Sequence, residues 1–335
     1  MSNILVAVKR GNIAENYHRG HICVVNNRKN IVFSVGNPHF ITYMRSCAKP
    51  IQAIPVITTG AYEKFGLTEK EITIFAGSLN GEDFQVEILR NILEKLKLKE
   101  SCLKCGIHPP SHKETRAKLK EYGVLHNNCA GKHLAMLTLC RFFDWPIENY
   151  DKMEHPVQQV ILKEISFFTE VKENDIHIGI DGCGVPVFAL PLYNLALAYM
   201  KFADYKQIND DSRQSAVRLL MKNALKYPEL IAGNRRICTE IMRAKSNVFA
   251  KVGADGSYGL SIFKKKLGIA LKIESGNMRA LNVAVIEVLR QLNVIDEKAL
   301  EQLKIFYDIK VFNHRKDVVG KFVPEFLLSK EGSNV

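Results

Sequence analysis

The stretch RSCAKP, residues 45–50, decides the fold, because it places a serine three residues before a lysine at the start of an apolar run. Residues three apart face the same way only when the backbone between them makes a helical turn. In that geometry the amine of Lys49 can take the hydroxyl proton of Ser46. The stretch therefore predicts a helix that opens at Ser46 and a serine activated by a lysine.

The Ser-x-x-Lys spacing recurs at Ser101 and Ser261, so the local context has to decide between three positions. Residues 258–263 alternate in the manner of a strand, so positions three apart point to opposite faces. Ser101 lies among Cys-Gly and Pro-Pro pairs, which indicate a loop. Only Ser46 opens a segment that can continue as a helix, because Pro50 is tolerated within a first turn.

Composition restricts the class of protein. A chain of 335 residues with 47% hydrophobic residues can build a full core in one large or two ordinary domains. The net charge of +12 is spread along the chain without a basic stripe, which argues against a nucleic-acid partner. The apolar runs at 4–8 and 185–200 are too short for a signal peptide or a membrane span. We therefore expect a cytoplasmic protein without a membrane partner, whose eight cysteines are free thiols, metal ligands or core residues rather than disulfides.

The order of the expected elements predicts the architecture. Strand patterns lie at residues 4–10, 21–26, 31–36, 176–180, 248–252 and 258–273. Helical patterns lie at 52–59, 83–97, 113–122, 131–143, 155–169, 212–227, 277–292 and 297–303. This order predicts an α/β (α+β) fold, in which an antiparallel sheet formed by both ends of the chain is flanked by helices. We expect a single domain with a sheet lobe at about 1–44 and 245–335 and an inserted helical lobe at about 45–244.

Two further motifs follow Ser46 in the order used by active-site-serine acyl transferases, namely Ser-x-Asn at Ser78 and Lys-x-Gly at Lys251. A lysine at its free pKa of about 10.4 is protonated, so it becomes a base only when it is desolvated or set beside another cation. Lys49 and Lys251 in one pocket would lower each other's pKa. The alternative is an N-cap serine, a surface lysine and two ordinary turns, and spacing leaves both interpretations open.

Two glycine-flanked thiols form a second group. Cys129 lies in HNNCAGKH, residues 126–133, which opens a helix, and Cys183 lies in DGCG, residues 181–184, which ends a strand. Together with His133 or another donor they would make a thiolate-rich site that prefers zinc. Two buried cysteines in the core are the alternative. The stretch CLKCGIH at 102–108 competes as a metal site, but it lacks a second pair of ligands and is interpreted as a loop.

Taken together, the blocks at residues 45–50, 77–78, 126–133, 181–186 and 251–256 resemble the asparaginase II family, the Rhizobium-type L-asparaginases. The similarity extends from about residue 5 to about 325. It implies a fold similar to that of serine β-lactamases and penicillin-binding proteins. It also implies hydrolysis of the side-chain amide of L-asparagine to aspartate and ammonia, and a homodimer.

The resemblance also implies roles for single residues. Ser46 with Lys49 and Ser78 with Lys251 would form two Ser-Lys pairs. Cys129, Lys132 and Cys183 would hold a zinc ion that aids substrate binding, with Asp181 beside it. Independently of the resemblance, we expect Arg45 and Asp181 to anchor the carboxylate and the ammonium of the substrate. The chain departs from the family pattern at Cys47, Leu79 and Asp255 and in a shorter segment before residue 126, all outside the catalytic positions.

The expected reaction is amide hydrolysis through an acyl-enzyme, in which Lys49 deprotonates Ser46. One alternative is a serine hydrolase of the same fold that acts on β-lactams or peptides. The other is a zinc-dependent binding protein that keeps the fold without catalysis. An assay for ammonia release separates the first possibility from the other two, and a nitrocefin assay detects the β-lactamase alternative.

Overall fold

The computed structural model describes residues 1–330. Contacts divide the chain into two compact units: unit 1 comprises Met1–Cys47, Leu190–Asp204 and the chain from Glu240 onward, and unit 2 comprises Ala48–Ala189 and Tyr205–Thr239. The predicted mixed α/β fold, with an antiparallel sheet built from both ends of the chain, is confirmed. One segment differs from the predicted lobes, since residues 190–204 belong to the sheet-containing unit.

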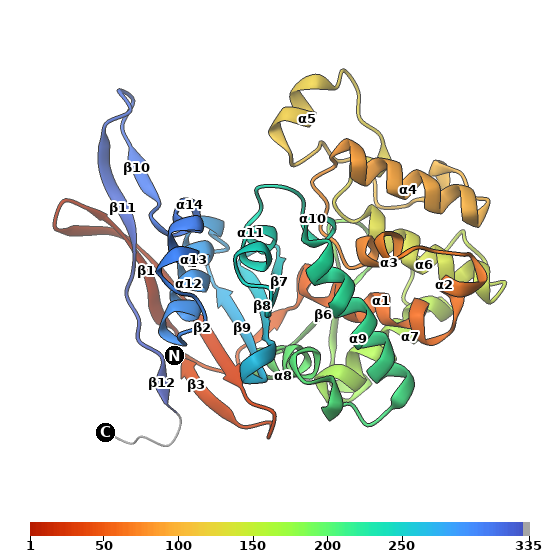
Figure 1. The fold of residues 1–335 in the computed structure, drawn as a ribbon, viewed down its shortest axis with the longest axis horizontal. Helices are drawn as coiled ribbons and strands as arrows, with labels where there is room; N and C mark the ends of the chain where they lie inside the picture. The colour runs from red at the N-terminus through yellow and green to blue at the C-terminus, as the bar shows by residue number, and fades with distance from the viewer. Residues whose placement is uncertain (331–335) are drawn as a thin grey trace. The chain divides into compact units, whose positions relative to one another are not determined.

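Unit 1 is built on an antiparallel sheet with the order β10-β11-β1-β2-β9-β8-β7, in which β3 also pairs with β2 and β12 pairs with β3 (Figure 1). The strands are β1 (Asn3–Arg10), β2 (Ile13–Val25), β3 (Ile31–Val35), β7 (Val248–Gly253), β8 (Ser257–Ile262), β9 (Leu267–Ile273), β10 (Lys310–Phe312), β11 (Val318–Pro324) and β12 (Ser329–Lys330). The single strand pattern at 258–273 is two strands, because a 3-10 turn at Phe263–Lys265 reverses the chain.

Helices cover both faces of the central strands. Helix α8 (Leu192–Ala203) packs on β2, β8 and β9, and α12 (Met278–Gln291) packs on β1, β8 and β9. Gly259 and Gly268 lie under α8, where a Cβ atom would come within 2.3 Å of Tyr199 and 2.0 Å of the Ala196 carbonyl. The small residues therefore allow α8 to approach the sheet closely, and they explain why an apolar segment of the chain's middle joins unit 1.

Unit 2 consists mainly of helices. They are α1 (Lys49–Thr58), α2 (Ala61–Lys64), α3 (Glu69–Phe75), α4 (Asp83–Leu96), α5 (Lys113–Lys118), α6 (Ala130–Phe142), α7 (Pro156–Thr169), α9 (Asp211–Lys226) and α10 (Pro228–Ile231), with a hairpin of β5 (His177–Ile180) and β6 (Pro186–Pro191). Helix α1 packs against α6, α7 and α9, and it is buried from Lys49 to Ile57. A helix that is apolar all round lies inside a bundle, so α1 is the central element of this unit.

The remaining elements are β4 (Ile41–Tyr43), α11 (Ile237–Ala244), α13 (Glu297–Gln302) and α14 (Lys304–Tyr307). All eight cysteines lie in the described part of the chain and are free thiols, as expected, and seven of them are buried. None of the helices in residues 1–330 combines the length and the apolar character that crossing a bilayer requires.

Candidate active site

The central group of unit 2 is the amine of Lys49, at the first residue of α1. Its side chain is fully buried, and Nζ donates to the hydroxyl oxygen of Ser78 at 3.3 Å and to the carbonyl oxygen of Asn128 at 2.9 Å. The rest of α1 is almost entirely apolar, so packing of the helix carries the lysine into the interior. The structure thus brings Lys49 directly to Ser78.

Burial alters the protonation of this lysine. Desolvation lowers the pKa of Lys49 below its ordinary value of 10.5, the charge of Cys129 opposes that shift, and the cation of Lys132 adds to it. A buried ammonium is costly because a low-dielectric interior replaces its hydration shell. Lys49 is therefore a lysine that can exist as the neutral amine, which is the form that accepts a proton.

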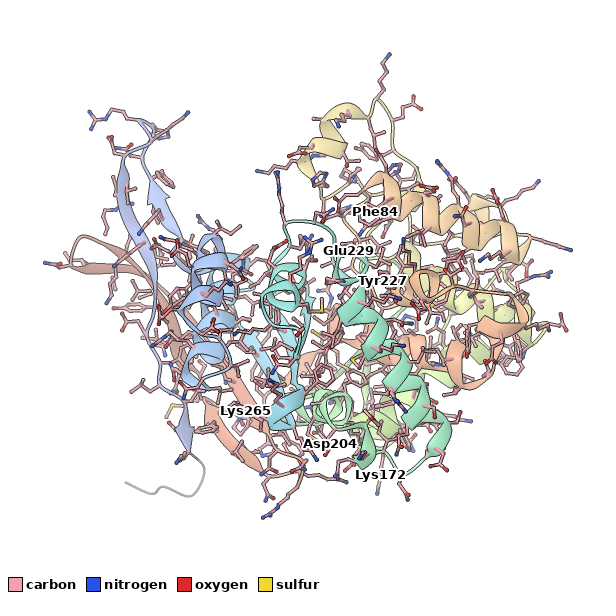
Figure 2. The ribbon with its side chains drawn as sticks, viewed as in Figure 1. Phe84, Lys172, Asp204, Tyr227, Glu229 and Lys265 are labelled. Carbon is pink, nitrogen blue, oxygen red and sulfur yellow. The ribbon has the colours of Figure 1, made fainter. Side chains whose placement is uncertain are left out.

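The turn that carries Ser78 is held by backbone hydrogen bonds and by one side chain. The N–H of Ser78 donates to the Ile231 carbonyl at 2.8 Å, and the N–H of Leu79 to the Asn128 carbonyl at 3.1 Å. The Oε1 atom of Gln85 accepts from the three backbone N–H groups of residues 80–82 at 3.0, 3.1 and 3.3 Å. Its amide donates to the carbonyl of Glu229, which is labelled in Figure 2, at 2.9 Å. The sequence did not predict this role of Gln85. The helical pattern that starts at residue 83 did place it in a first turn.

The second group of unit 2 is a thiol and carboxylate cluster. The ligand atoms of Cys129, Asp181 and Cys183 all lie within 4.8 Å of one another. Lys132 forms an ion pair with Asp181 at 2.8 Å, and both side chains are at most 8% exposed. Cys129 precedes α6, where the side chain of Asn127 accepts from its N–H at 2.8 Å. The structure therefore brings the two thiol blocks together at one place in unit 2.

The ionisable groups of this cluster shift one another's pKa values. A hydrogen bond from Cys183 and the nearby lysines lower the pKa of Cys129, so this thiol ionises first. Burial acts to lower the pKa of Lys132, but the charges of Cys129, Cys183 and Asp181 outweigh it and raise the pKa. Lys132 is accordingly a cation in this arrangement.

The chemistry of the donors fits a zinc ion. Two thiol sulfurs and a carboxylate oxygen within a short distance are donors that zinc prefers, and Cys129 readily becomes a thiolate. Lys132 contacts the same carboxylate and would have to lose its proton to bind a metal. His133, the donor considered with the thiols, lies outside the group, because its Nδ1 pairs with the Tyr150 hydroxyl at 2.7 Å.

Ser46, Arg45 and Lys251 belong to unit 1. Ser46 is half-buried in a 3-10 turn, Arg45–Ala48, that runs straight into α1, so the predicted helix opens three residues later than Ser46. A 3-10 turn places side chains three apart above one another, which is the local geometry that Ser-x-x-Lys requires. Arg45 forms an ion pair with Asp255.

Lys251 lies on β7 and is fully buried, with Nζ donating to the Val252 carbonyl at 3.2 Å. The thiol of Cys47 donates to the backbone carbonyl of Lys251 at 3.3 Å, and the Tyr199 hydroxyl donates to the carbonyl of Cys47 at 3.0 Å. The segment that contains Ser46 is therefore fixed beside β7 within unit 1. The four predicted catalytic residues are divided equally between the two units.

Comparisons with known proteins were made for sequence and structure. A search of curated protein sequences found no match. Among solved structures, a β-lactamase from Mycobacterium bovis matches with a TM-score of 0.41 and 10% identity over 81% of this chain and 94% of that one. A glutaminase from Bacillus matches with a TM-score of 0.36 and 15% identity over 82% and 91%.

The sequence match to a family is far more extensive. The family model for L-asparaginase II matches residues 6–324, which is nearly the whole described chain. It includes every residue singled out above in both units. The chain belongs to the L-asparaginase II family, and this membership supports an amidohydrolase activity.

Proposed function

We propose that this protein is an L-asparaginase, which hydrolyses L-asparagine to L-aspartate and ammonia through a covalent acyl-enzyme. Ser46 is the nucleophile and Lys49 its general base. Membership of the family supports the reaction class. The choice of asparagine as substrate rests on the resemblance of the five motif blocks.

The observation that carries the proposal is the state of Lys49. Its amine is wholly buried, its pKa is lowered, and it donates to the hydroxyl oxygen of Ser78, the second predicted serine, at 3.3 Å. A surface lysine or a purely structural N-terminal turn would have none of these three properties. Positioned acid–base groups of this kind contribute roughly 10²- to 10⁴-fold to rates.

A single lysine, Lys49, can carry the proton through every step of the reaction. As Ser46 Oγ attacks the side-chain carbonyl carbon, its proton passes to the neutral Lys49, a C–O bond forms and the carbonyl oxygen becomes an oxyanion. Collapse of the oxyanion breaks the C–N bond, and the proton on Lys49 leaves with ammonia. Water then attacks the ester, gives one proton through Lys49 to Ser46, and releases aspartate.

The other predicted residues support these steps. Ser78, which accepts from Lys49, relays protons to and from it. In the proposed mechanism Lys251 holds positive charge near the developing oxyanion, and Arg45 and Asp181 bind the substrate's carboxylate and ammonium. In the metal-free arrangement Asp181 neutralises Lys132.

Zinc is part of the same proposal. Cys129 and Cys183, with Lys132 or Asp181, would hold the ion, which as a Lewis acid supplies electrostatic attraction for the polar groups of the substrate. After dialysis against a zinc salt, we expect one zinc ion per chain, and a colorimetric chelator measures the bound metal. Cys129→Ser and Cys183→Ser should lose the bound metal, whereas Cys102→Ser should keep it; equal zinc in all three would reject the site.

The nucleophile is tested by Ser46→Ala, with Ser101→Ala as the matched control because Ser101 is exposed and also precedes a lysine by three residues. We expect loss of ammonia release from L-asparagine in the first variant and full activity in the second. Activity of folded Ser46→Ala equal to that of the wild type would contradict the assignment. Hydrolysis of nitrocefin without ammonia release would favour the β-lactamase alternative, and bound zinc with neither activity would favour the binding protein.

A further inference from the structure

A pocket of about 310 Å³ lies in unit 2 next to the turn that follows Ser78. We call it the Arg236 pocket, and its walls include Asn80, His112, Lys113, Asn234, Arg235 and Arg236. Arg235 and Arg236 come from the loop between α10 and α11, and Lys113 opens α5. None of these residues has a place in the proposed reaction.

The charge of the wall is strongly one-sided. Three cationic side chains face it, against the single carboxylate of Glu114, which is already paired with Arg235 at 2.9 Å. Arg236 donates to the neutral Oδ1 of Asn80 at 3.1 Å, and in residues 1–330 it has no ion pair. Lys113 has no ion pair in that range either. Two cations of this pocket therefore form no ion pair within the described chain.

The buried carboxylate of Glu82 is engaged by neighbouring amide groups and forms no ion pair with Arg236. Glu82 is 6% exposed, and its oxygens accept from the backbone N–H of Asn234 at 2.9 Å, from the Asn234 amide at 2.9 Å and from the Asn80 amide at 3.2 Å. These bonds orient Asn80, itself 2% exposed, so that its Oδ1 accepts from Arg236. A satisfied carboxylate thus builds the floor of the pocket and leaves the guanidinium of Arg236 for another partner.

The backbone beside Arg236 is held in a costly conformation. Arg235 has φ of +57°, in the left-handed region that non-glycine residues rarely adopt. Gly233 has φ of +107°, and a Cβ atom there would lie 2.3 Å from the Asn80 amide. Such strain persists where the surrounding structure fixes it, and it is common where a loop presents ligand-binding groups.

We propose that the Arg236 pocket binds a small oxyanion, the carboxylate or phosphate group of a metabolite. The planar guanidinium of Arg236 offers paired N–H donors that match either group, and Lys113 and Arg235 add positive charge. A pocket of this volume accommodates a small molecule. The ligand would contact Asn80, two residues after Ser78, without taking part in the reaction.

The test is isothermal titration calorimetry on the full chain, with inorganic phosphate and succinate as probes and tetramethylammonium chloride as the cationic comparison. Wild-type protein should bind an oxyanion with a dissociation constant below about 10 mM, and binding should weaken as salt is added. Arg236→Gln should weaken it at least tenfold, because a charge-assisted hydrogen bond is lost. Arg218→Gln removes an exposed arginine of α9 in the same unit and should change nothing.

The tighter of the two probes identifies the source of the anion. Lys113→Gln changes an exposed residue and serves as a second variant in case Arg236→Gln does not fold. It should weaken the binding of the oxyanion several-fold. Absence of binding by both probes, or equal affinity in folded Arg236→Gln and Arg218→Gln, would overturn the proposal. Ammonia release is not used as a readout, so the result is independent of the proposed function.

Discussion

The amine of Lys49 shows how burial makes a base from a residue that is ordinarily an acid. It is fully buried and has two oxygen acceptors, Ser78 Oγ and the Asn128 carbonyl. Its lowered pKa follows mainly from desolvation. Burial in this environment therefore favours the neutral form of the amine relative to a solvated lysine.

We expect Lys49→Arg and Lys49→Met to lower kcat for ammonia release by roughly 10²- to 10⁴-fold, since arginine cannot lose its proton and methionine has none to exchange. The wild-type kcat/KM should rise with pH as Lys49 loses its proton, with an apparent pKa below 10.5. Steady-state kinetics across pH measure both. Lys172→Met replaces an exposed lysine of the same unit outside the site and serves as the control. An unchanged kcat in folded Lys49→Arg would refute the role of Lys49 as general base.

At the level of elements, the first turn of α4 holds the turn that carries Ser78. Gln85 is fully buried, and one oxygen accepts from three backbone N–H groups. Gln85→Leu would leave these donors buried without an acceptor, at a cost of about 1–3 kcal/mol for an unsatisfied group. We expect a lower free energy of unfolding by urea denaturation and a reduced kcat.

Gln85→Glu is the matched variant, because it keeps the accepting oxygen and loses only the donor to the Glu229 carbonyl. It should retain more activity than Gln85→Leu. If both variants keep the wild-type kcat while losing stability, Gln85 supports the fold alone and has no influence on the position of Ser78.

A second element-level feature joins α12 to α14 in unit 1. The carboxylate of Glu287, 3% exposed, accepts from Arg290, Gln291 and Tyr307 at 2.7 to 2.8 Å. Burial would raise the pKa of Glu287, but these hydrogen bonds outweigh it and lower the pKa below 4.5. A lowered carboxyl pKa stabilises the fold above the unfolded value, and that stability is lost as pH falls through the folded pKa.

Glu287→Gln should therefore lower the free energy of unfolding at pH 7 by roughly 1–3 kcal/mol, and the difference should shrink as the pH falls below 4.5. Urea denaturation at several pH values measures this. Glu301→Gln, 71% exposed, should have little effect at any pH. A difference that grows in acid would contradict the sign of the linkage.

For the whole molecule, the expected homodimer remains a proposal, and unit 1 carries a feature that supports it. Ile13 and Tyr17 on β2 and Phe312 and Val318 on the β10–β11 hairpin are more than half exposed. Strands β2 and β11 lie on opposite sides of β1 in the sheet (Figure 1). Exposed apolar side chains on the same sheet can form an interaction surface. We expect sedimentation velocity to show a dimer, and Ile13→Lys with Phe312→Glu to give a monomer, whereas Ile305→Lys, exposed on α14, should leave the dimer intact.

Much of this molecule followed from local patterns in the sequence. Periodicity predicted the helices later seen as α4, α6, α7, α9 and α12 within two residues at each end, and motif blocks were sufficient to identify the family. These signals are local, because hydrophobic spacing and backbone hydrogen bonding act over one or two turns of chain. The strands β10 and β11 were not predicted, because only one of their residues, Phe322, is buried, and a strand without a buried face carries little hydrophobic alternation.

By itself, then, the sequence determined the order of the elements, the membership of the L-asparaginase II family and the residue types available for chemistry. Only the tertiary structure decided that Lys49 meets Ser78, that Asp181 joins the two thiols and that residues 190–204 belong with the sheet. The same holds for Gln85 and for the Arg236 pocket, whose parts lie up to 156 residues apart. The physical reason is that burial and desolvation depend on which distant segments pack together, and no spacing along the chain specifies that.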